Sequence, residues 1–131
     1  MTHLLDTNIC IQVMRGIDRI HARMGERPPE SFALSVVTYF ELAVGVKKAR
    51  QKAKEQDRLQ WLLTTIPRLD FGPQAAEEAA DIRAHLEAKG RGIGPYDNLI
   101  AGHARSLGLV LVTGNTDGFS RVPNLELEHW A

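Results

Sequence analysis

MTHLLDTN, residues 1–8, is the stretch around which the rest of the chain is organised. Leu4 and Leu5 predict a short buried strand, and Asp6 follows at its carboxyl end. Thr7 and Asn8 are residue types that cap helices, so we expect a helix to begin there. Open α/β sheets bind their ligands in the crevice at the carboxyl ends of their strands. The function therefore depends on which other side chains converge on Asp6.

Length and composition indicate an ordinary globular protein. The chain has 131 residues, enough for a real core, so we expect one domain over residues 1–131. Hydrophobic residues make up 44% and charged residues 24%, which is typical of such proteins. The formal net charge is zero, so no general field attracts nucleic acid, although a local basic patch could still bind phosphates.

The sequence also predicts where the protein works. Cys10 is the only cysteine, which excludes a disulfide within the chain and fits a reducing cytoplasm. No run of 18 apolar residues occurs, so we expect no membrane span. Asp6 lies where a secretory signal would need its apolar region. We therefore expect a cytoplasmic protein with no membrane partner.

Strand and helix patterns alternate along the chain. Strands are expected at residues 3–6, 32–35, 68–71 and 110–113, with an edge strand around 125–127. Helices are expected at residues 7–15, 18–27, 36–50, 73–89 and 95–106, and around Leu59, Leu62, Leu63 and Ile66. This alternation predicts an α/β fold in which helices cover both faces of a parallel sheet.

The helix expected over residues 36–50 carries Glu41. Its apolar side is predicted to consist of Val37, Phe40, Val44 and Val46. Glu41 comes four residues after Val37, so its side chain should point towards that side.

Four acidic residues are placed where they could meet. Asp6 ends a strand, Glu41 lies within a helix, Asp97 lies in the first turn of a helix, and Asp117 follows a strand. Three of them have ordinary structural explanations. The helix dipole stabilises a negative charge in the first turn, where Asp97 lies. Asp117, which precedes Gly118, is typical of a turn, and Glu41 could be an ion-paired acid on a helix surface. Asp6 differs, because a carboxylate that ends an apolar strand is poorly solvated and needs partners.

Together the acids predict a divalent metal site. Carboxylates a few ångströms apart repel one another, and at least one would hold a proton at neutral pH. A divalent cation removes this repulsion, and Mg²⁺ prefers oxygen ligands and needs only one or two protein carboxylates. None of the five histidines has the spacing of metal ligands, so we treat them as structural or exposed.

At these acids the sequence resembles the PIN-domain ribonucleases, and more closely the VapC-type toxins of bacterial type II toxin–antitoxin pairs. The resemblance covers essentially the whole chain. It rests on four motifs in the family's order and spacing, LLDTN at 4–8, SVVTYFEL at 35–42, GPYDNLIA at 94–101 and LVTGNTDGF at 111–119. Any one motif would be weak evidence, whereas four in order are specific.

The resemblance implies a three-layer α/β/α fold around a central, mainly parallel sheet of about five strands. It implies Mg²⁺- or Mn²⁺-dependent cleavage of RNA, with transfer RNA a frequent target of sequences of this kind. It also implies a homodimer and a cognate VapB-type antitoxin, whose carboxyl-terminal segment lies over the acidic site. Operator DNA would be contacted only through the antitoxin complex.

Residue by residue, Asp6, Glu41 and Asp97 match the three core acids of the family. We expect Asp6 and Asp97 to hold the principal metal, with support from Glu41 and Asp117. Glu41 is the candidate for orienting the attacking water or taking its proton. Thr7 matches a position that hydrogen-bonds at the site.

The fourth acid departs from the family pattern. Many relatives carry it immediately before the phenylalanine that matches Phe119, where this chain has Gly118. Asp117 comes one residue earlier, and three roles stay open for it: a direct ligand, contact through water, or no contact. Asn115 and Thr116 are nearby polar candidates, with Asn115 expected to hydrogen-bond at the site.

RNA also needs positively charged contacts. Arg91 lies in the glycine-rich stretch just before Asp97 and is the better-placed candidate for a phosphate. The densest basic stretch, residues 47–54, is better explained as a solvated helix face. The glycines at residues 90–94 follow a helix rather than a strand, so they do not form a dinucleotide-binding fingerprint.

Two other functions remain open. A phosphatase of the haloacid-dehalogenase type would need a second aspartate two residues after Asp6, where this chain has Asn8, and would leave Glu41 unexplained. A non-catalytic PIN-like module that binds RNA or protein is the other alternative, because the fourth acid is imperfect.

Overall fold

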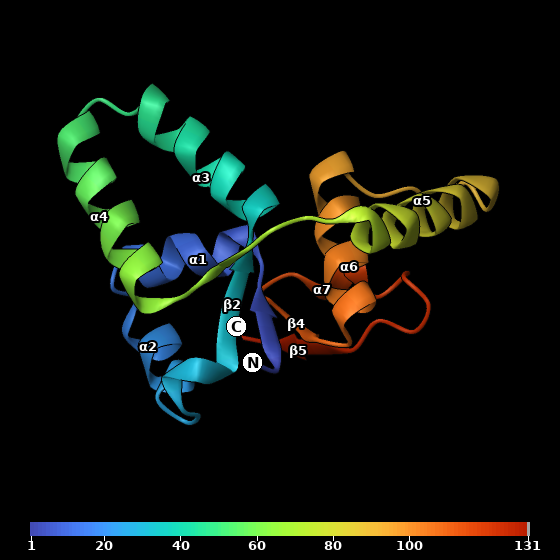
Figure 1. Cartoon of the computed structure of the whole chain (residues 1–131), viewed down its shortest axis with the longest axis horizontal. Coiled ribbons are helices and arrows are strands. Elements are labelled where there is room, and N and C mark those ends of the chain that lie inside the picture. Colours follow the sequence, from blue (N-terminus) through green and yellow to red (C-terminus); the bar gives the residue numbers. More distant parts are fainter. Residues whose placement is uncertain (131) are drawn as a thin grey trace.

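The computed structural model describes residues 1–130, and in it a five-stranded parallel sheet is covered by helices on both faces (Figure 1). The strands are β1 (His3–Leu5), β2 (Phe32–Ser35), β3 (Arg68–Leu69), β4 (Val110–Thr113) and β5 (Leu127–His129). They lie in the order β3-β2-β1-β4-β5, and every neighbouring pair is parallel. The predicted fold class is confirmed.

The helices also follow the predicted order. They are α1 (Thr7–Met14), α2 (Asp18–Met24), α3 (Val36–Lys48), α4 (Lys52–Thr65), α5 (Pro73–Ala88), α6 (Pro95–Leu107) and the short α7 (Thr116–Phe119), with a 3-10 turn, η1 (Pro29–Ser31). The basic stretch lies on the end of α3, the following turn and the start of α4, and α7 was not predicted. Within residues 1–130 no helix is both long and apolar enough to cross a membrane.

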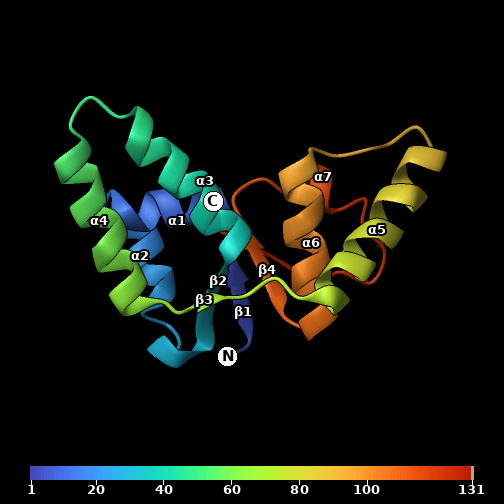
Figure 2. The same ribbon diagram turned by 45° about the horizontal axis from the view of Figure 1, so that its top comes forward.

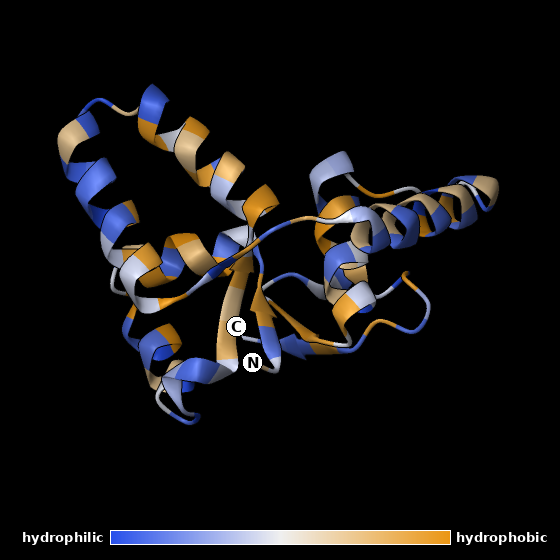
Figure 3. Cartoon of the chain, viewed as in Figure 1, coloured by the Kyte–Doolittle hydropathy of each residue, from blue (hydrophilic) through white to orange (hydrophobic). Residues whose placement is uncertain are grey.

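β1 lies in the middle of the sheet and separates two cores. Leu5 packs on one face with the core residues of α1 to α4, and Leu4 packs on the other face with those of α5 and α6. The alternation follows from the strand geometry, in which successive side chains point to opposite faces. Figure 2 shows α1 to α4 on one side of the strands and α5 to α7 on the other, and Figure 3 shows the hydrophobic strands between them.

The strand order places the predicted crevice beside β1. From the end of β1 the chain passes into α1 on one face, and from the end of the adjacent β4 it passes into α7 on the other. This divergence is the switch point at which open α/β sheets bind ligands. Asp6 follows β1 directly, so it lies at this point.

The predicted apolar side of α3 is half right. Val46 is buried and Val37 packs partly buried against one of the cores, whereas Phe40 is 49% exposed and Val44 is 38% exposed. The other buried positions of this helix are Thr38 and Leu42. Because the core face includes a threonine, hydropathy alone did not locate it.

His103 joins the two helices that carry Glu41 and Asp97. Its Nδ1 lies 2.8 Å from Oγ of Ser35, which caps α3 by accepting a hydrogen bond from the Val37 backbone at 3.0 Å. Burial lowers the pKa of His103, outweighing the opposite effect of its hydrogen bond to the Asp70 backbone. A neutral imidazole on α6 therefore stabilises the start of α3, in agreement with a structural role.

Close packing of α5 against α6 requires a glycine. A Cβ atom added at Gly102 would lie 2.6 Å from the backbone of Ala79. Asn98 adds a hydrogen bond across the same contact, from Nδ2 to the Ala79 carbonyl at 2.7 Å. The depth to which α6 packs, and so the position of Asp97 at its start, depends on this contact.

We therefore predict that Gly102→Ala lowers the free energy of unfolding by about 3 kcal/mol, because two helix backbones must separate. The matched control is Gly45→Ala on α3, where an added Cβ meets nothing within 4 Å. That control should be neutral or stabilising by about 0.5–1 kcal/mol. Urea denaturation measures both, and a Gly102→Ala protein as stable as the wild type would contradict the packing.

Candidate active site

Asp6 both ends β1 and begins α1. Its backbone N–H donates to the Val112 carbonyl at 3.0 Å, extending the pairing with β4. Its Oδ1 accepts a hydrogen bond from the Ile9 backbone at 2.9 Å, so Asp6 is the N-cap of α1. The expectation that Thr7 or Asn8 would cap this helix is wrong, because the extended backbone of Asp6 lets its own carboxylate reach the first turn.

Asp6 is only 5% exposed, and its surroundings disfavour its charged form. Burial raises the pKa of Asp6, hydrogen bonds from Thr113 and the Ile9 backbone lower it, and the charges of Asp97 and Glu41 raise it further; the net effect is an increase. Two carboxylates from distant parts of the sequence thus act on Asp6. The structure brings the three predicted core acids to one edge of the sheet.

Thr113, at the end of β4, is a neighbour of Asp6 that the sequence analysis missed. Its hydroxyl accepts a hydrogen bond from the Asn115 backbone N–H at 3.0 Å. The single proton of the hydroxyl can go either to the Asn115 carbonyl, 3.0 Å away, or to Asp6. The register could have revealed this neighbour, because parallel strands that end together bring their last residues side by side.

Glu41 is held by Thr7, which is itself hydrogen-bonded to Thr38. Thr7 Oγ1 lies 2.8 Å from Glu41 Oε1 and 3.2 Å from Thr38 Oγ1. Since Thr7 has one hydroxyl proton, it donates to the carboxylate and accepts from Thr38. The predicted hydrogen-bonding position of Thr7 therefore lies against a core acid. Thr38 was not predicted, although its place three residues before Glu41 puts it on the same helix face.

Asp97 lies in the first turn of α6, on the outer side of the sheet edge that contains Asp6. The residue is exposed, yet its carboxyl group is sheltered enough that burial raises its pKa. Gly94 is the N-cap of α6, and a Cβ there would lie 3.8 Å from Asp97 Oδ2. The preceding loop therefore passes close to the carboxylate without crowding it.

The other predicted site residues lie further out. Asp117 is exposed on α7, and its backbone N–H donates to Oδ1 of Asn115 at 3.1 Å, so Asn115 caps this short helix. Arg91 is exposed in the loop before α6. Gly118 faces Ile93, whose Cγ2 would lie 3.4 Å from an added Cβ. The roles of Asp117, Asn115 and Arg91 stay predictions.

The donor chemistry of the edge fits a hard cation. The groups around Asp6 are carboxylates and threonine hydroxyls, which are oxygen donors of the kind that Mg²⁺ and Mn²⁺ prefer. A positive ion there would offset both the burial of Asp6 and its repulsion by two acids. Within residues 1–130, however, no three acidic, histidine or cysteine side chains are already arranged around one point as a metal would need.

Comparison with known proteins decides the family. The model of the PIN domain matches residues 3–125. The chain belongs to the PIN-domain family. Among PIN-domain proteins, the tRNA(fMet)-specific endonuclease VapC of Shigella flexneri is 37% identical over 133 residues, which cover 98% of this chain and 97% of that protein. The ribonuclease VapC2 of Rickettsia felis is 35% identical and covers 99% of this chain and 98% of that protein.

Solved PIN-domain structures agree with this assignment. DNA-bound VapBC from Salmonella typhimurium has a TM-score of 0.95 at 35% identity, covering 100% of this chain and 99% of that one. VapBC2 from Rickettsia felis, bound to a DNA fragment from its promoter, has a TM-score of 0.94 at 34% identity and covers both chains fully. The resemblance to VapC-type PIN domains that the four motifs predicted is confirmed.

The double role of Asp6 predicts different effects of two substitutions on stability. Asp6→Asn keeps an oxygen that caps α1 and removes a buried charge, so without metal at neutral pH it should be as stable as the wild type or more so. Asp6→Ala removes the same charge but also loses the cap, so it should be about 1 kcal/mol less stable than Asp6→Asn. Since the pKa of Asp6 is raised, the wild type becomes relatively more stable as the pH falls and the carboxyl is protonated, which removes the advantage of Asp6→Asn.

Denaturation in EDTA at two pH values measures these differences. Equal destabilisation by both substitutions at neutral pH would show that the carboxylate does not cap the helix.

Proposed function

We propose that this PIN domain is the toxin of a type II toxin–antitoxin pair, an endoribonuclease that hydrolyses RNA phosphodiester bonds with the help of Mg²⁺ or Mn²⁺. The observation that carries the proposal is that the charges of Glu41 and Asp97 act on the buried Asp6 at one edge of the sheet and disfavour its charged form. The relatives support it, because they are named ribonucleases and tRNA(fMet)-specific endonucleases. Transfer RNA is therefore the first substrate to test.

The residues that would hold the cation are Asp6 and Asp97, with Glu41 and Asp117 in support. The chemistry that a divalent cation supplies in such a site is neutralisation of charge on the phosphate and a lower pKa for a nearby water. Asp6 is already fixed by the hydrogen bond from the Ile9 backbone and is only 5% exposed, so it is the rigid member of the pair. Asp97, at the exposed start of α6, is the member that is free to adjust.

We assign to Glu41 the role of accepting the proton of the attacking water. A carboxylate in this role must be held within hydrogen-bonding reach of the water. Thr7 holds one oxygen, Oε1, at 2.8 Å. The other oxygen can then accept from a water that faces Asp6.

An antitoxin of the VapB type would cover this edge. α1, α3 and α4 line a cavity of about 480 Å³ that contains apolar Ile11, Met14 and Leu42 as well as Glu41. A peptide that fills the cavity would therefore reach a core acid. Solved relatives include the DNA-bound VapBC structures of Rickettsia felis and Salmonella typhimurium, and we extend this arrangement to the present chain, with operator DNA contacted only through the complex.

A homodimer is also part of the proposal. A dimer needs an exposed apolar surface, and Ile9 and Val13 on α1 cannot supply one because both are buried in the core. Trp61 on α4 is 46% exposed and stacks on His21 at 6.2 Å between ring centroids, so its surface is available for such a contact.

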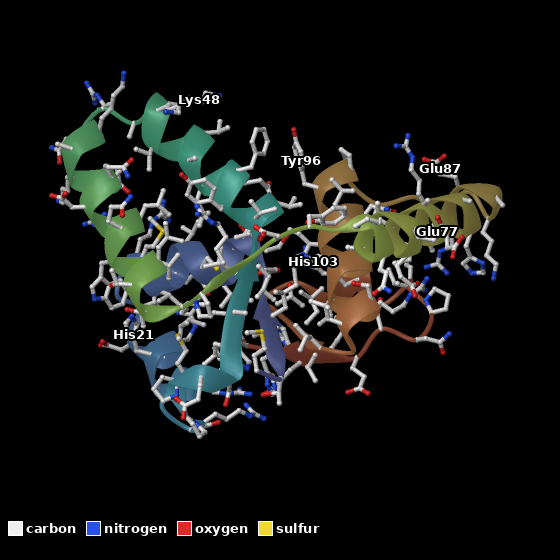
Figure 4. The ribbon with its side chains drawn as sticks, viewed as in Figure 1. His21, Lys48, Glu77, Glu87, Tyr96 and His103 are labelled. Carbon is white, nitrogen blue, oxygen red and sulfur yellow. The ribbon has the colours of Figure 1, made fainter. Side chains whose placement is uncertain are left out.

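The central test is cleavage of total transfer RNA by the purified protein with Mg²⁺ or Mn²⁺. We expect defined fragments that EDTA prevents, and a loss of about 10²–10³-fold in rate for Asp6→Asn. The matched control is Glu77→Gln, an exposed acid on α5 well away from the edge (Figure 4), which should cleave normally. Full activity of Asp6→Asn would contradict the assignment, and RNA binding without cleavage would favour the non-catalytic module.

Arg91 gives a separate prediction about RNA binding. Arg91→Ala should weaken binding and make its salt dependence shallower, by about 0.7 in the slope of log affinity against log salt, because one phosphate contact is lost. Arg83→Ala on α5 removes the same charge from an exposed ion pair with Glu87 and serves as the control. Fluorescence anisotropy with a labelled RNA measures both, and equal effects of the two substitutions would rule out a specific contact.

A further inference from the structure

A cluster of basic side chains projects from the turn between α3 and α4. It consists of Lys47, Lys48, Arg50, Lys52 and Lys54, all of them exposed, and we refer to it as the basic tip. Figure 1 shows this turn at an outer end of the molecule, away from the strands, and Figure 4 shows Lys48 there. Five of the 16 basic residues lie in this stretch and none of the 16 acidic ones does, so the zero net charge of the chain conceals a strong local one.

The acids that follow the basic tip in the sequence do not neutralise it. Within residues 1–130 none of the five side chains of the tip forms an ion pair. Glu55 pairs instead with Arg58 at 3.0 Å, and Asp57 lines a separate cavity together with His21. The explanation of this stretch as an ordinary solvated helix face therefore lacks the balancing charges that it needs.

Helix stability does not account for the basic tip either. Lys47 and Lys48 lie in the last turn of α3, where the helix dipole favours positive charge. Lys52 and Lys54 lie in the first turn of α4, where the same dipole disfavours it, and the N-cap residue, Gln51, makes no capping hydrogen bond there. Two members of the tip are thus placed against the preference of their own helix, which is typical of functional rather than structural residues.

The basic tip is continuous with the acids along α3. Lys48 comes seven residues after Glu41, which is two turns further on the same helix face and about 10 Å along the axis. Arg50 and Glu41 also line the same cavity of about 480 Å³. A polymer bound at Glu41 therefore reaches the tip within a few of its units.

We propose that the basic tip binds phosphates of the RNA strand that continues from the acids along α3, away from the bond that is cut. The inference rests on the proposed function and adds a second point at which the substrate is held. Each phosphate that a lysine or arginine neutralises releases counterions, so a cluster of positive charge without acids binds RNA irrespective of its base sequence. The acids repel the phosphate next to them until a cation is bound, whereas the tip attracts the strand with or without the cation.

An acidic segment of a protein is the competing occupant. Protein interfaces are depleted in lysine and depend on a few large apolar or aromatic side chains. Four of the five members of the basic tip are lysines, and the only apolar residues within 47–54 are Ala49 and Ala53. The tip offers charge without an apolar anchor, which suits a phosphate backbone better than a protein segment.

The test measures binding of a labelled single-stranded RNA to the cleavage-deficient Asp6→Asn protein over a range of salt concentrations. Combining Lys48→Gln, Lys52→Gln and Lys54→Gln should weaken binding by about 100-fold at about 0.1 M salt, because three phosphate contacts are lost. The slope of log affinity against log salt should become shallower by about 2. Arginine at the same three positions keeps the charge and should retain both affinity and slope.

Two controls separate the basic tip from net charge and from folding. Combining Arg19→Gln, Arg68→Gln and Arg83→Gln removes three exposed charges from α2, β3 and α5, and should leave the slope unchanged. The glutamine variant of the tip should melt at the same temperature as its parent or higher, because two charges that oppose the dipole of α4 are gone.

Unchanged affinity and slope in the glutamine variant of the tip, or equal losses in that variant and the arginine control, would overturn the proposal. Weaker binding of polyglutamate with unchanged binding of RNA would overturn it in favour of an acidic protein segment. Because binding is measured on protein that does not cleave, failure of the wild type to cut RNA would reject the proposed function, while the salt slopes would still decide on the tip. Normal cleavage by the wild type with unchanged slopes would reject the tip alone.

Discussion

The structure depends on a carboxylate that is buried where a strand becomes a helix. Asp6 continues the pairing of β1 with β4 through its backbone and caps α1 through its side chain. Water cannot solvate the charge well at this position, so its neighbours must. The Ile9 backbone supplies a hydrogen bond and the Thr113 hydroxyl can supply a second, whereas Asp97 and Glu41 add repulsion. The fold thus places a carboxylate where a bound cation would be stabilised.

The packing of α3, α5 and α6 determines the geometry at the same carboxyl edge of the sheet. Gly102 lets α6 approach α5, and His103 on α6 bonds to Ser35 at the start of α3. These contacts set the positions of Asp97 and Glu41 relative to β1. Residues away from the acidic edge therefore determine how close the three acids lie to one another. The mutual repulsion of the acids lowers the stability of the fold, as is common at functional sites.

Much of this arrangement could be predicted from the sequence, because it depends on local patterns. The strand pairs with β1 follow from short apolar runs, and the buried side of α5 follows from Ala75, Ala79, Ile82 and Leu86, all of which are buried. The acids Asp6 and Asp97 were recognisable because each lies at a strand end or helix start. Their arrival at one edge follows because β1 ends at that edge and α6, which leads back to the start of the neighbouring parallel strand β4, begins near it.

What could not be predicted depends on tertiary contacts. Thr38 occupies a buried position of α3 through its contact with Thr7, so hydropathy misplaced the apolar side and left Phe40 and Val44 in the wrong environment. The capping of α1 by Asp6 needed the backbone angles of the strand end. The role of Asp117 also stays a prediction, because a one-residue shift in a loop changes the direction of a carboxylate without changing any pattern.

The central claim is that Asp6 and Asp97 bind one divalent cation, and anomalous scattering from crystals grown with Mn²⁺ tests it most directly. The account predicts one strong peak at the sheet edge, about 2.1 Å from a carboxylate oxygen of each residue, and its loss in Asp6→Asn crystals. A peak elsewhere on the protein with none at this edge, or a peak that persists unchanged in Asp6→Asn, would contradict the claim.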